Sequence, residues 1–208
     1  MNKKIKVSVV GGSGYTGIEL LRLLALHPNV EILHITSRND SGKFVHEIYP
    51  SLRGVLSNQF VDPDKVELAD SNLVFFATPS GIAMNYVEKL LSKEVKVIDL
   101  AADFRIKDIK EWEKWYEMPH KCPDVLKKAV YGLPEVNRDL IMNAQIIANP
   151  GCYPTAIQLA LNPLLNEGLI DPESIIADAK SGISGAGKKN QVDLLLSEAS
   201  ENFKAYSI

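Results

Sequence analysis

Short apolar runs separated by polar turns recur along most of the chain. The run 72–77 is continuous, as expected of a central strand of a parallel sheet, and the run Ile5–Val10 is rich in β-branched residues. The predicted strands are Ile5–Val10, Val30–Thr36, 72–77, 96–100 and 145–148. Helical segments alternate with these strands and are predicted at 18–27, 82–91, 108–116, 138–143 and 156–161. This alternation predicts an α/β fold of the Rossmann type, with a doubly wound parallel sheet.

The sheet-forming pattern ends near residue 148, where we place a domain boundary. Residues 1–148 are predicted to form the Rossmann domain, and residues 149–208 to form the first part of a truncated α+β domain. In that second part, residues 175–180 are predicted as a strand and residues 190–201 as partly helical. Residues 41–71 contain Pro50, Gly54 and Pro63, so this stretch is predicted to be irregular.

Composition places the chain among globular proteins. It has 208 residues, of which 46% are hydrophobic and 24% charged, and its net charge is −3. That charge gives no general attraction to nucleic acid or to an anionic membrane, so neither is expected as a partner. The apolar run at the N-terminus stops at Val10, too early for a signal peptide or a membrane span. We therefore expect a soluble cytoplasmic protein. Cys122 and Cys152 form no Cys-x-x-Cys pair, so no disulfide framework or metal site is expected.

The turn after the first strand is rich in glycine and reads Gly11-Gly12-Ser13-Gly14-Tyr15-Thr16-Gly17. Two registers, Gly12-x-Gly14-x-x-Gly17 and Gly11-x-x-Gly14-x-x-Gly17, fit a dinucleotide-binding fingerprint between a strand and a helix. Small residues there let the backbone approach a pyrophosphate at the helix N-terminus. The competing interpretation is a turn that only packs the helix against the strand.

The end of the second strand bears on the choice of dinucleotide. An NAD-dependent enzyme would carry an acidic residue there for the ribose hydroxyls, but this chain has Ser37 and Arg38, with Lys43 nearby. A hydroxyl and a guanidinium suit a 2′-phosphate, so NADP is the expected cofactor. The alternative is that Arg38 is a solvated loop residue.

Two further loops follow strands that are predicted to be central. Thr78, Pro79 and Ser80 come after residues 72–77, and they are candidate cofactor-binding residues because ligands bind at the carboxyl edge of parallel sheets. Ser80 is also expected to cap the next helix. Arg105 follows residues 96–100 and is a candidate for the same edge. The aromatic residues of the predicted surface helix 108–116, which include two tryptophans, are expected to serve packing.

The strongest candidate for chemistry is the segment 149–155, which reads Asn-Pro-Gly-Cys-Tyr-Pro-Thr. It joins a buried strand to a helix that is also expected to be buried, with Pro154 in the first turn. Cys152 then lies at a helix N-terminus, where the partial positive charge favours a thiolate. A thiol so placed suits a nucleophile. The competing interpretation is a small buried apolar cysteine.

Six stretches together resemble the N-acetyl-γ-glutamyl-phosphate reductases of arginine biosynthesis, within the wider aspartate-semialdehyde dehydrogenase superfamily. They occur in the family's order at residues 11–17, 37–38, 103–105, 131–135, 149–155 and 181–187. The resemblance covers nearly the whole chain, and the joint pattern is far more specific than any single motif.

This resemblance implies an oxidoreductase that acts on a small-molecule acyl phosphate. Cys152 would displace phosphate to form a thioester, which NADPH would reduce to an aldehyde. By the same resemblance, Arg105 would hold the phosphate, and Ser181 and Gly182 would lie near the nicotinamide. Asn149 would orient the thiol or donate to the oxyanion, or else only cap the turn. The full-length protein is expected to be a homo-oligomer.

Two alternatives stay open on the sequence alone. The substrate could be an aminoadipyl or aspartyl phosphate, because acyl-chain specificity lies largely in residues that the motifs do not include. The chain could also be an NADP-binding module without catalysis, which does not need an activated thiol.

The chain departs from the family at its C-terminal end. Family members continue past the position of Tyr206 into a His-Arg-His segment that carries the general base. The histidines present do not match that base, and they are His27, His34, His46 and His120. We therefore expect a truncated chain with impaired turnover or none, and with apolar surface left uncovered.

Overall fold

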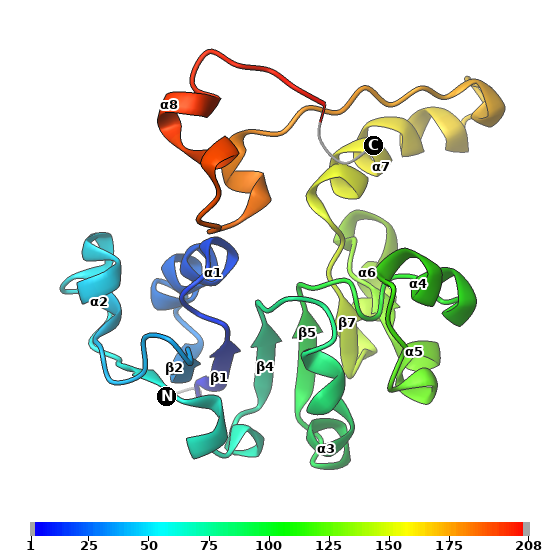
Figure 1. Ribbon diagram of the computed structural model, residues 1–208. Coiled ribbons are helices and arrows are strands. Elements are labelled where there is room, and N and C mark those ends of the chain that lie inside the picture. Colours follow the sequence, from blue (N-terminus) through cyan, green and yellow to red (C-terminus); the bar gives the residue numbers. More distant parts are fainter. Residues whose placement is uncertain (1–2, 206–208) are drawn as a thin grey trace.

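A single parallel sheet with helices on both faces organises the computed structural model, which describes residues 3–205 (Figure 1). The strand order is β3-β2-β1-β4-β5-β7-β6, and every ladder is parallel. The strands are β1 (Ile5–Val10), β2 (Val30–Thr36), β3 (Phe60–Val61), β4 (Leu73–Phe76), β5 (Lys96–Asp99), β6 (Val130–Tyr131) and β7 (Ile146–Ala148). The doubly wound α/β fold predicted from the sequence is confirmed. Residues 206–208 of the predicted second domain lie outside the described part, and the boundary at residue 148 stays a prediction.

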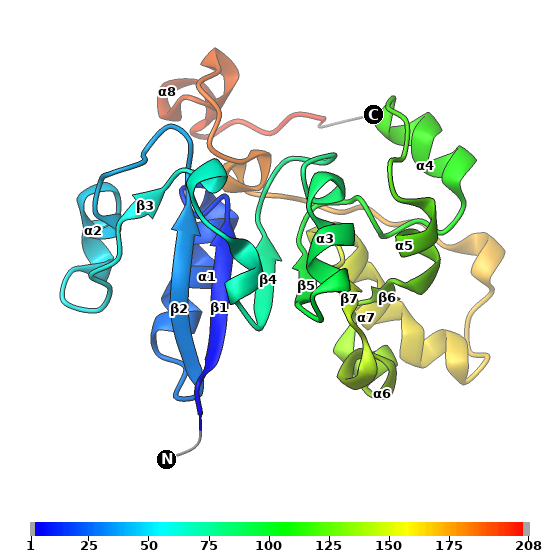
Figure 2. The same ribbon diagram turned by 90° about the horizontal axis from the view of Figure 1, so that it is seen from below.

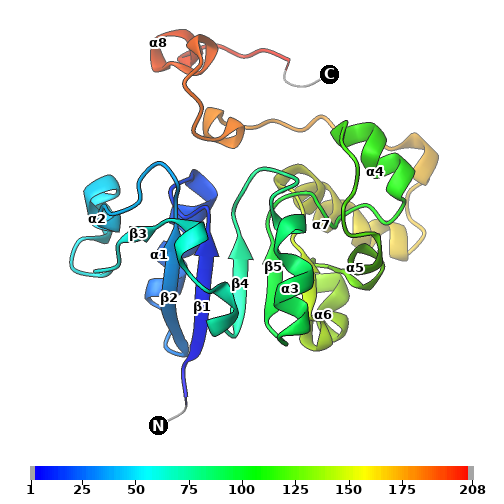
Figure 3. The same cartoon turned by 60° about the horizontal axis from the view of Figure 1, so that its bottom comes forward.

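Helices connect the strands on alternate sides, with α1 and α3 on opposite faces of the sheet (Figures 2 and 3). The helices are α1 (Tyr15–Ala25), α2 (Val45–Ile48), α3 (Val87–Ser92), α4 (Ile109–Tyr116), α5 (Pro123–Lys128), α6 (Pro134–Asn143), α7 (Cys152–Asn166) and α8 (Leu196–Ala199). Short 3₁₀ turns are η1 (Pro50–Leu52), η2 (Pro63–Lys65), η3 (Leu68–Asp70), η4 (Ala83–Asn85), η5 (Pro172–Ser174), η6 (Ile183–Ala186) and η7 (Val192–Leu194). None of the helices in residues 3–205 combines the length and apolar character needed to cross a membrane.

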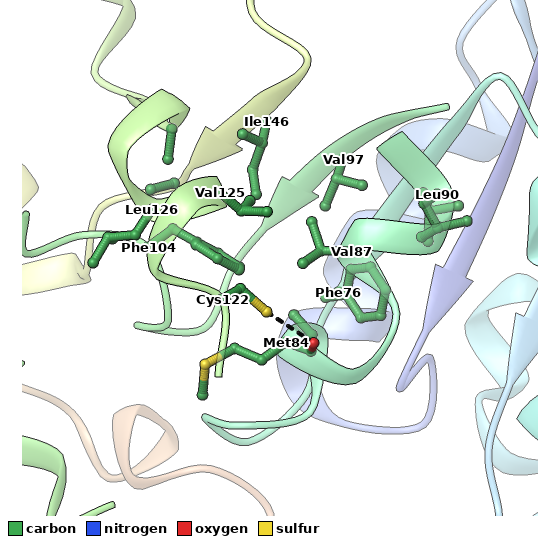
Figure 4. Close-up of a cluster of buried hydrophobic side chains, with 14 of the residues drawn as sticks. Phe76, Met84, Val87, Leu90, Val97, Phe104, Cys122, Val125, Leu126 and Ile146 are labelled. Atoms are coloured by element: carbon green, nitrogen blue, oxygen red, sulfur yellow. Dashed lines mark hydrogen bonds between the residues drawn. The ribbon is translucent and has the colours of Figure 1, made fainter. Parts of the chain in front are cut away.

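Two apolar clusters fix the sheet and its helices. The larger one joins β4, β5 and β7 to α3 and α5, and it includes Phe76, Val97 and Ile146 (Figure 4). Cys122 lies within it and donates its thiol hydrogen to the carbonyl of Met84, at 3.0 Å. The smaller cluster packs α1 and α2 against β1, β2 and β3. Together the two clusters fix the central strands side by side, so that their carboxyl ends lie along one edge of the sheet.

Helix α4 shows how packing and capping cooperate. Asp108 accepts hydrogen bonds from the backbone N–H groups of Lys110 and Glu111, which begins the helix. Trp112 is fully buried, and its Nε1 donates to the carbonyl of Ala102 at 2.9 Å. This tryptophan serves packing, as predicted, whereas Trp115 remains 69% exposed.

Entry into α3 differs from the prediction. Ser80 does not cap a helix over 82–91, because Gly81 adopts φ +89° and turns the chain before the helix can begin. A 3₁₀ turn, η4, comes first, and α3 starts after Tyr86 with no side-chain cap. The prediction of a Ser80 cap was therefore wrong.

Two predictions beyond β7 were also wrong. Residues 175–180 form no strand, because no neighbouring strand of the described chain offers them a ladder. The segment 156–161 lies in α7, and none of the residues of that helix is buried, since the other described elements cover only part of its surface. The prediction of partial helix over 190–201 agrees with η7 and α8. The stretch 41–71, predicted to be irregular, contains α2 and β3.

Candidate functional site

The carboxyl edge of the sheet gathers most of the residues that the sequence singled out. The glycine-rich turn follows β1, Ser37 follows β2, Thr78 lies just beyond β4, and Asn149 follows β7. Because all strands run in the same direction, these turns meet along one edge, where ligands of doubly wound sheets bind.

The glycine-rich turn forms a close-packed cradle at the start of α1. Gly11 has φ +83°, and a Cβ there would lie 2.4 Å from the carbonyl oxygen of Ala77. A Cβ on Gly17 would lie 2.6 Å from the carbonyl oxygen of Gly11, so the helix rests directly on the turn. Gly14 is the N-cap residue, so no side chain accepts a hydrogen bond from the first turn of the helix. A Cβ on Gly14 would have one neighbour within 4 Å, the carbonyl oxygen of Gly11 at 3.8 Å. The N–H groups of the first helical turn have no intrahelical acceptors, and this arrangement fits a dinucleotide pyrophosphate.

Hydrogen bonds of three hydroxyl groups, those of Ser13, Ser37 and Tyr49, stabilise the glycine-rich turn. Ser13 and Ser37 share a hydrogen bond of 2.8 Å between their side-chain oxygens. Tyr49 donates its hydroxyl hydrogen to the carbonyl of Ser13, at 2.5 Å. Tyr49 was not expected in the site, because it lies in the stretch predicted to be irregular and no local motif marks it. Ser37 is 7% exposed, so it lies in the wall of the site.

A cavity of about 250 Å³ opens beside the cradle. Its lining consists of Val10, Gly11, Thr36, Ser37, Arg38, Pro63, Thr78, Pro79, Ile82, Asn85 and Tyr86. The cavity thus brings together cofactor candidates from the ends of β1, β2 and β4. Ser80 is not in its lining. Pro63, Asn85 and Tyr86 are additions that the sequence alone did not indicate, because they come from turns without a recognisable motif.

Arg38 is held at the rim of this cavity by acidic partners. Its Nη1 and Nη2 donate to the two carboxylate oxygens of Asp64 at 2.6 and 3.1 Å, and Nη1 lies 3.7 Å from an oxygen of Asp62. The hydrogen bond from Arg38 lowers the pKa of Asp64 below its usual value. Lys43 pairs with Asp40 at 2.9 Å. The cations that suggested a 2′-phosphate site therefore have carboxylate partners in this structure.

Arg105 is fixed against the cysteine-bearing turn. Its Nε donates to the carbonyl of Asn149 and its Nη2 to the carbonyl of Leu100, both at 2.7 Å. The remaining nitrogen, Nη1, lies only 3.1 Å from the position that a Cβ on Gly151 would occupy. The guanidinium is therefore positioned by backbone carbonyls while one nitrogen faces the residue next to Cys152.

Cys152 is the first residue of α7 and is exposed. Gly151 precedes it as the N-cap, and the N–H and hydroxyl of Thr155 both donate to the Gly151 carbonyl, at 3.0 and 2.8 Å. These bonds hold the thiol at the start of the helix, where the helix dipole favours an anion. The interpretation of Cys152 as a buried apolar residue is wrong. Asn149 donates its side-chain N–H to the Pro150 carbonyl at 3.0 Å, so here its side chain closes the turn.

The second cysteine provides a clear contrast. Cys122 is 1% exposed, and burial raises the pKa of its thiol to about 11. It donates to the Met84 carbonyl and lies in the apolar core. A thiol in this environment remains protonated at neutral pH and serves packing.

Two buried acids lie under the edge, beside Arg105. Asp99 and Asp103 are both fully buried; one oxygen of Asp99 accepts from the N–H of Ala101, and one oxygen of Asp103 accepts from the N–H of Gly81. Within residues 3–205 the second oxygen of each acid lacks a hydrogen-bond partner. Burial and, to a smaller extent, the nearby Asp103 raise the pKa of Asp99 to about 7, and burial also raises the pKa of Asp103. Near neutral pH the pair therefore carries less charge than two ordinary carboxylates. A single acid in an apolar strand is the sequence signal that could have identified Asp99.

The second glycine-rich loop, residues 181–187, is exposed. Ser181 donates its hydroxyl hydrogen to the carbonyl of Gly182 at 2.9 Å, within the loop itself. Just beyond it, the Nζ of Lys188 lies 5.4 Å from the centre of the Tyr49 ring. Since Tyr49 supports Ser13, this contact brings the later loop toward the side of the sheet where α1 begins (Figure 1). The assignment of Ser181 and Gly182 to the nicotinamide stays a prediction.

The chain matches known proteins along most of its length. A family model described as the NAD binding domain of semialdehyde dehydrogenase matches residues 6–144, and one described as the dimerisation domain of semialdehyde dehydrogenase matches residues 152–208. N-acetyl-gamma-glutamyl-phosphate reductase of Thiobacillus denitrificans is 57% identical over 204 residues, covering 98% of this chain and 60% of that protein. The protein of the same name from Laribacter hongkongensis is 58% identical with the same coverage. The chain thus spans about 60% of the length of these curated relatives.

Solved structures show the same fold. Aspartate semialdehyde dehydrogenase II of Vibrio cholerae, complexed with ASA, superposes with a TM-score of 0.63 at 18% identity, covering 90% of this chain and 49% of that one. Aspartate semialdehyde dehydrogenase of Candida albicans with NADP gives a TM-score of 0.60 at 16% identity, with 81% and 48% covered. The resemblance drawn from the motifs is confirmed by these relatives and by the matching domain models. The chain belongs to the semialdehyde dehydrogenase family, and residues 6–144 match that family's NAD-binding domain.

Proposed function

We propose that this chain is part of an NADPH-dependent reductase that converts N-acetyl-γ-glutamyl phosphate to the corresponding semialdehyde. The observation that carries the proposal is the position of Cys152, exposed at the first residue of α7 and next to a glycine that Arg105 faces. The names of relatives more than 55% identical to the chain support this acyl group over aminoadipyl or aspartyl phosphate.

The cradle residues are proposed to hold the cofactor. The N–H groups of the first turn of α1 would bind the pyrophosphate, because a glycine N-cap leaves them open. Arg38 would bind the 2′-phosphate that distinguishes NADP from NAD. Thr78 and Pro79 line the adjoining cavity. Ser80 is proposed to contact the cofactor beside it, and Ser181 and Gly182 are proposed to lie near the nicotinamide. When bound, NADPH supplies the hydride for the reduction.

Cys152 would perform the covalent step. Its thiolate attacks the acyl carbon, a carbon–sulfur bond forms, and the carbon–oxygen bond to phosphate breaks, so that inorganic phosphate leaves with the bonding electron pair. Hydride addition to the thioester carbon then expels the thiolate and releases the aldehyde. Arg105 would stabilise the departing phosphate, because a guanidinium donor suits that anion and its orientation is already fixed.

We also propose that the full-length protein is a homo-oligomer. The second part of the chain matches a dimerisation domain, and α7 carries half-exposed apolar residues such as Leu159 and Leu164. Cover by another copy or by further chain would remove this surface from water. Measurement of the molar mass of the full-length protein in solution tests the proposal, and a monomer at all concentrations would contradict it.

The covalent step can be tested without complete turnover. The chain is incubated with N-acetyl-γ-glutamyl phosphate, and mass spectrometry follows an acyl adduct while released phosphate is measured. We expect one adduct on Cys152, one phosphate per adduct, and neither in Cys152→Ser. Iodoacetamide should likewise label Cys152 much faster than the buried Cys122, which serves as the internal control. A folded chain with an unreactive Cys152 would contradict the reductase and favour a non-catalytic dinucleotide-binding module.

A further inference from the structure

The Arg38 guanidinium already forms a bidentate ion pair with the carboxylate of Asp64. Both terminal nitrogens donate to the two oxygens of Asp64, a geometry that matches what a phosphate would take. Asp64 belongs to η2, whose first residue, Pro63, lines the same cavity as Arg38. The carboxylate therefore lies where an anionic substituent of a ligand in that cavity would approach Arg38.

We propose that Asp64 is a specificity-determining residue that competes with the 2′-phosphate of the dinucleotide for Arg38. The proposal rests on the proposed function, in which Arg38 binds that phosphate. A guanidinium offers this planar pair of donors to one bidentate anion at a time, so a phosphate that binds through Nη1 and Nη2 must displace the carboxylate. The displaced carboxylate then remains nearby and repels the phosphate. Asp64 thus weakens the binding of the dinucleotide that carries a 2′-phosphate and leaves the affinity for the dinucleotide without it unchanged.

The pair is built so that exchange is easy. The side chains of Arg38 and Asp64 are 60% and 61% exposed, and exposed ion pairs contribute little to stability. Within residues 3–205, Arg38 is the only side chain to which the Asp64 carboxylate is bonded. Its loss from Arg38 therefore leaves no buried group unpaired.

The neighbouring acid has a different task. Asp62 caps η2 by accepting the N–H of Asp64 at 3.0 Å, and its side chain is only 30% exposed. It stands 3.7 Å from Arg38, too far for a hydrogen bond. Asp62 thus stabilises the turn that contains Asp64, and Asp64 is the residue that accepts the hydrogen bonds of the Arg38 guanidinium.

Asp64→Asn tests the competition, because asparagine keeps the size of the side chain and removes its charge. Glu67→Gln is a matched control, since Glu67 also pairs bidentately with a cation on an exposed surface, at 2.8 and 3.0 Å from Lys89. Binding of 2′,5′-ADP and of 5′-AMP is measured by calorimetry at low and high salt. Both probes report binding alone, so the test does not depend on turnover.

We expect Asp64→Asn to tighten 2′,5′-ADP binding by about two- to fivefold at low salt and less at high salt. Binding of 5′-AMP should not change, and Glu67→Gln should match the wild type with both probes. The gain should disappear when Asp64→Asn is combined with Arg38→Ala. Weaker 2′,5′-ADP binding in Asp64→Asn would mean that the acid positions Arg38, and it would overturn the proposal. An unchanged affinity, or an equal gain in Glu67→Gln, would overturn it as well.

The single variant Arg38→Ala separates this inference from the function on which it rests. If Arg38→Ala binds 2′,5′-ADP as tightly as the wild type, the assignment of the 2′-phosphate to Arg38 is wrong. If Arg38→Ala loses affinity for 2′,5′-ADP while Asp64→Asn gains none, the cofactor assignment stands and the role of Asp64 is wrong.

Discussion

Replacement of Asp99 by asparagine is expected to change how the stability of this fold depends on pH. Asp99 ends β5, is fully buried, and has one oxygen bonded to the N–H of Ala101 at 3.1 Å. Burial, followed by the nearby Asp103, raises the pKa of its carboxyl to about 7, and the hydrogen bond from Ala101 and the charge of Arg105 oppose the rise. Asparagine keeps the shape and the accepting oxygen but cannot ionise.

The sign follows from proton binding. An unfolded aspartate has a pKa near ~3.9, so between about pH 4 and pH 7 the folded state binds more protons at Asp99 than the unfolded state does. The contribution of Asp99 to stability is therefore fully present below the unfolded pKa and is lost as the pH rises through the folded pKa. A shift of roughly three pKa units corresponds to about 4 kcal/mol. Above pH 7 the wild type bears this full cost, and Asp99→Asn does not.

Urea unfolding of both proteins between pH 5 and pH 8 measures the effect. The free energy of unfolding of Asp99→Asn, relative to the wild type, should increase with pH across this range and level off above about pH 7. Asp124→Asn is a control whose difference from the wild type should stay constant between pH 5 and pH 8, because Lys127 lowers the pKa of the exposed Asp124 carboxyl and this group therefore titrates below that range. If the difference between Asp99→Asn and the wild type is the same at pH 5 and pH 8, the argument from burial is refuted.

Two further substitutions test the cradle and the support of the edge. Gly17→Ala should abolish binding of 2′,5′-ADP and lower stability, because its Cβ would lie 2.6 Å from the carbonyl oxygen of Gly11; wild-type affinity in calorimetry would show that the helix can move away from the turn. Trp112→Phe should lower the free energy of unfolding by about 1–3 kcal/mol, because it removes a buried hydrogen bond to Ala102 and part of a fully buried ring. An unchanged urea midpoint would contradict the packing role of this tryptophan.

Periodicity predicted the strands of three or more residues and missed those of two. The bounds of β1 and β2 agree with the sequence pattern residue for residue, because both segments are rich in β-branched residues, which favour strands. In contrast, β3 and β6 have two residues each and were missed. They exist because Phe60 pairs with Ile35 and Tyr131 with Ala148, and such pairings depend on a neighbour that the local sequence does not identify.

Burial was predictable only where the partner element was part of the described chain. Apolar residues of β4 and β5 are buried as expected, since α3 and α5 cover them. The equally apolar α7 contains no buried residue, because the described elements cover only part of its surface. An apolar helix indicates that a surface needs cover, and only the tertiary structure shows whether the cover is there.

The sequence by itself determined the fold class, the glycine cradle and the position of Cys152 at a strand-to-helix turn. These features depend on residues within one strand or one turn, so local patterns are enough to specify them. Only the tertiary structure decided three hydrogen bonds of the site. They run from Tyr49 to the Ser13 carbonyl, from Arg105 to the Asn149 carbonyl, and from Arg38 to the Asp64 carboxylate. The paired residues are 36, 44 and 26 positions apart along the chain. They come within hydrogen-bond distance only because the packed parallel sheet brings the turns at its carboxyl edge together.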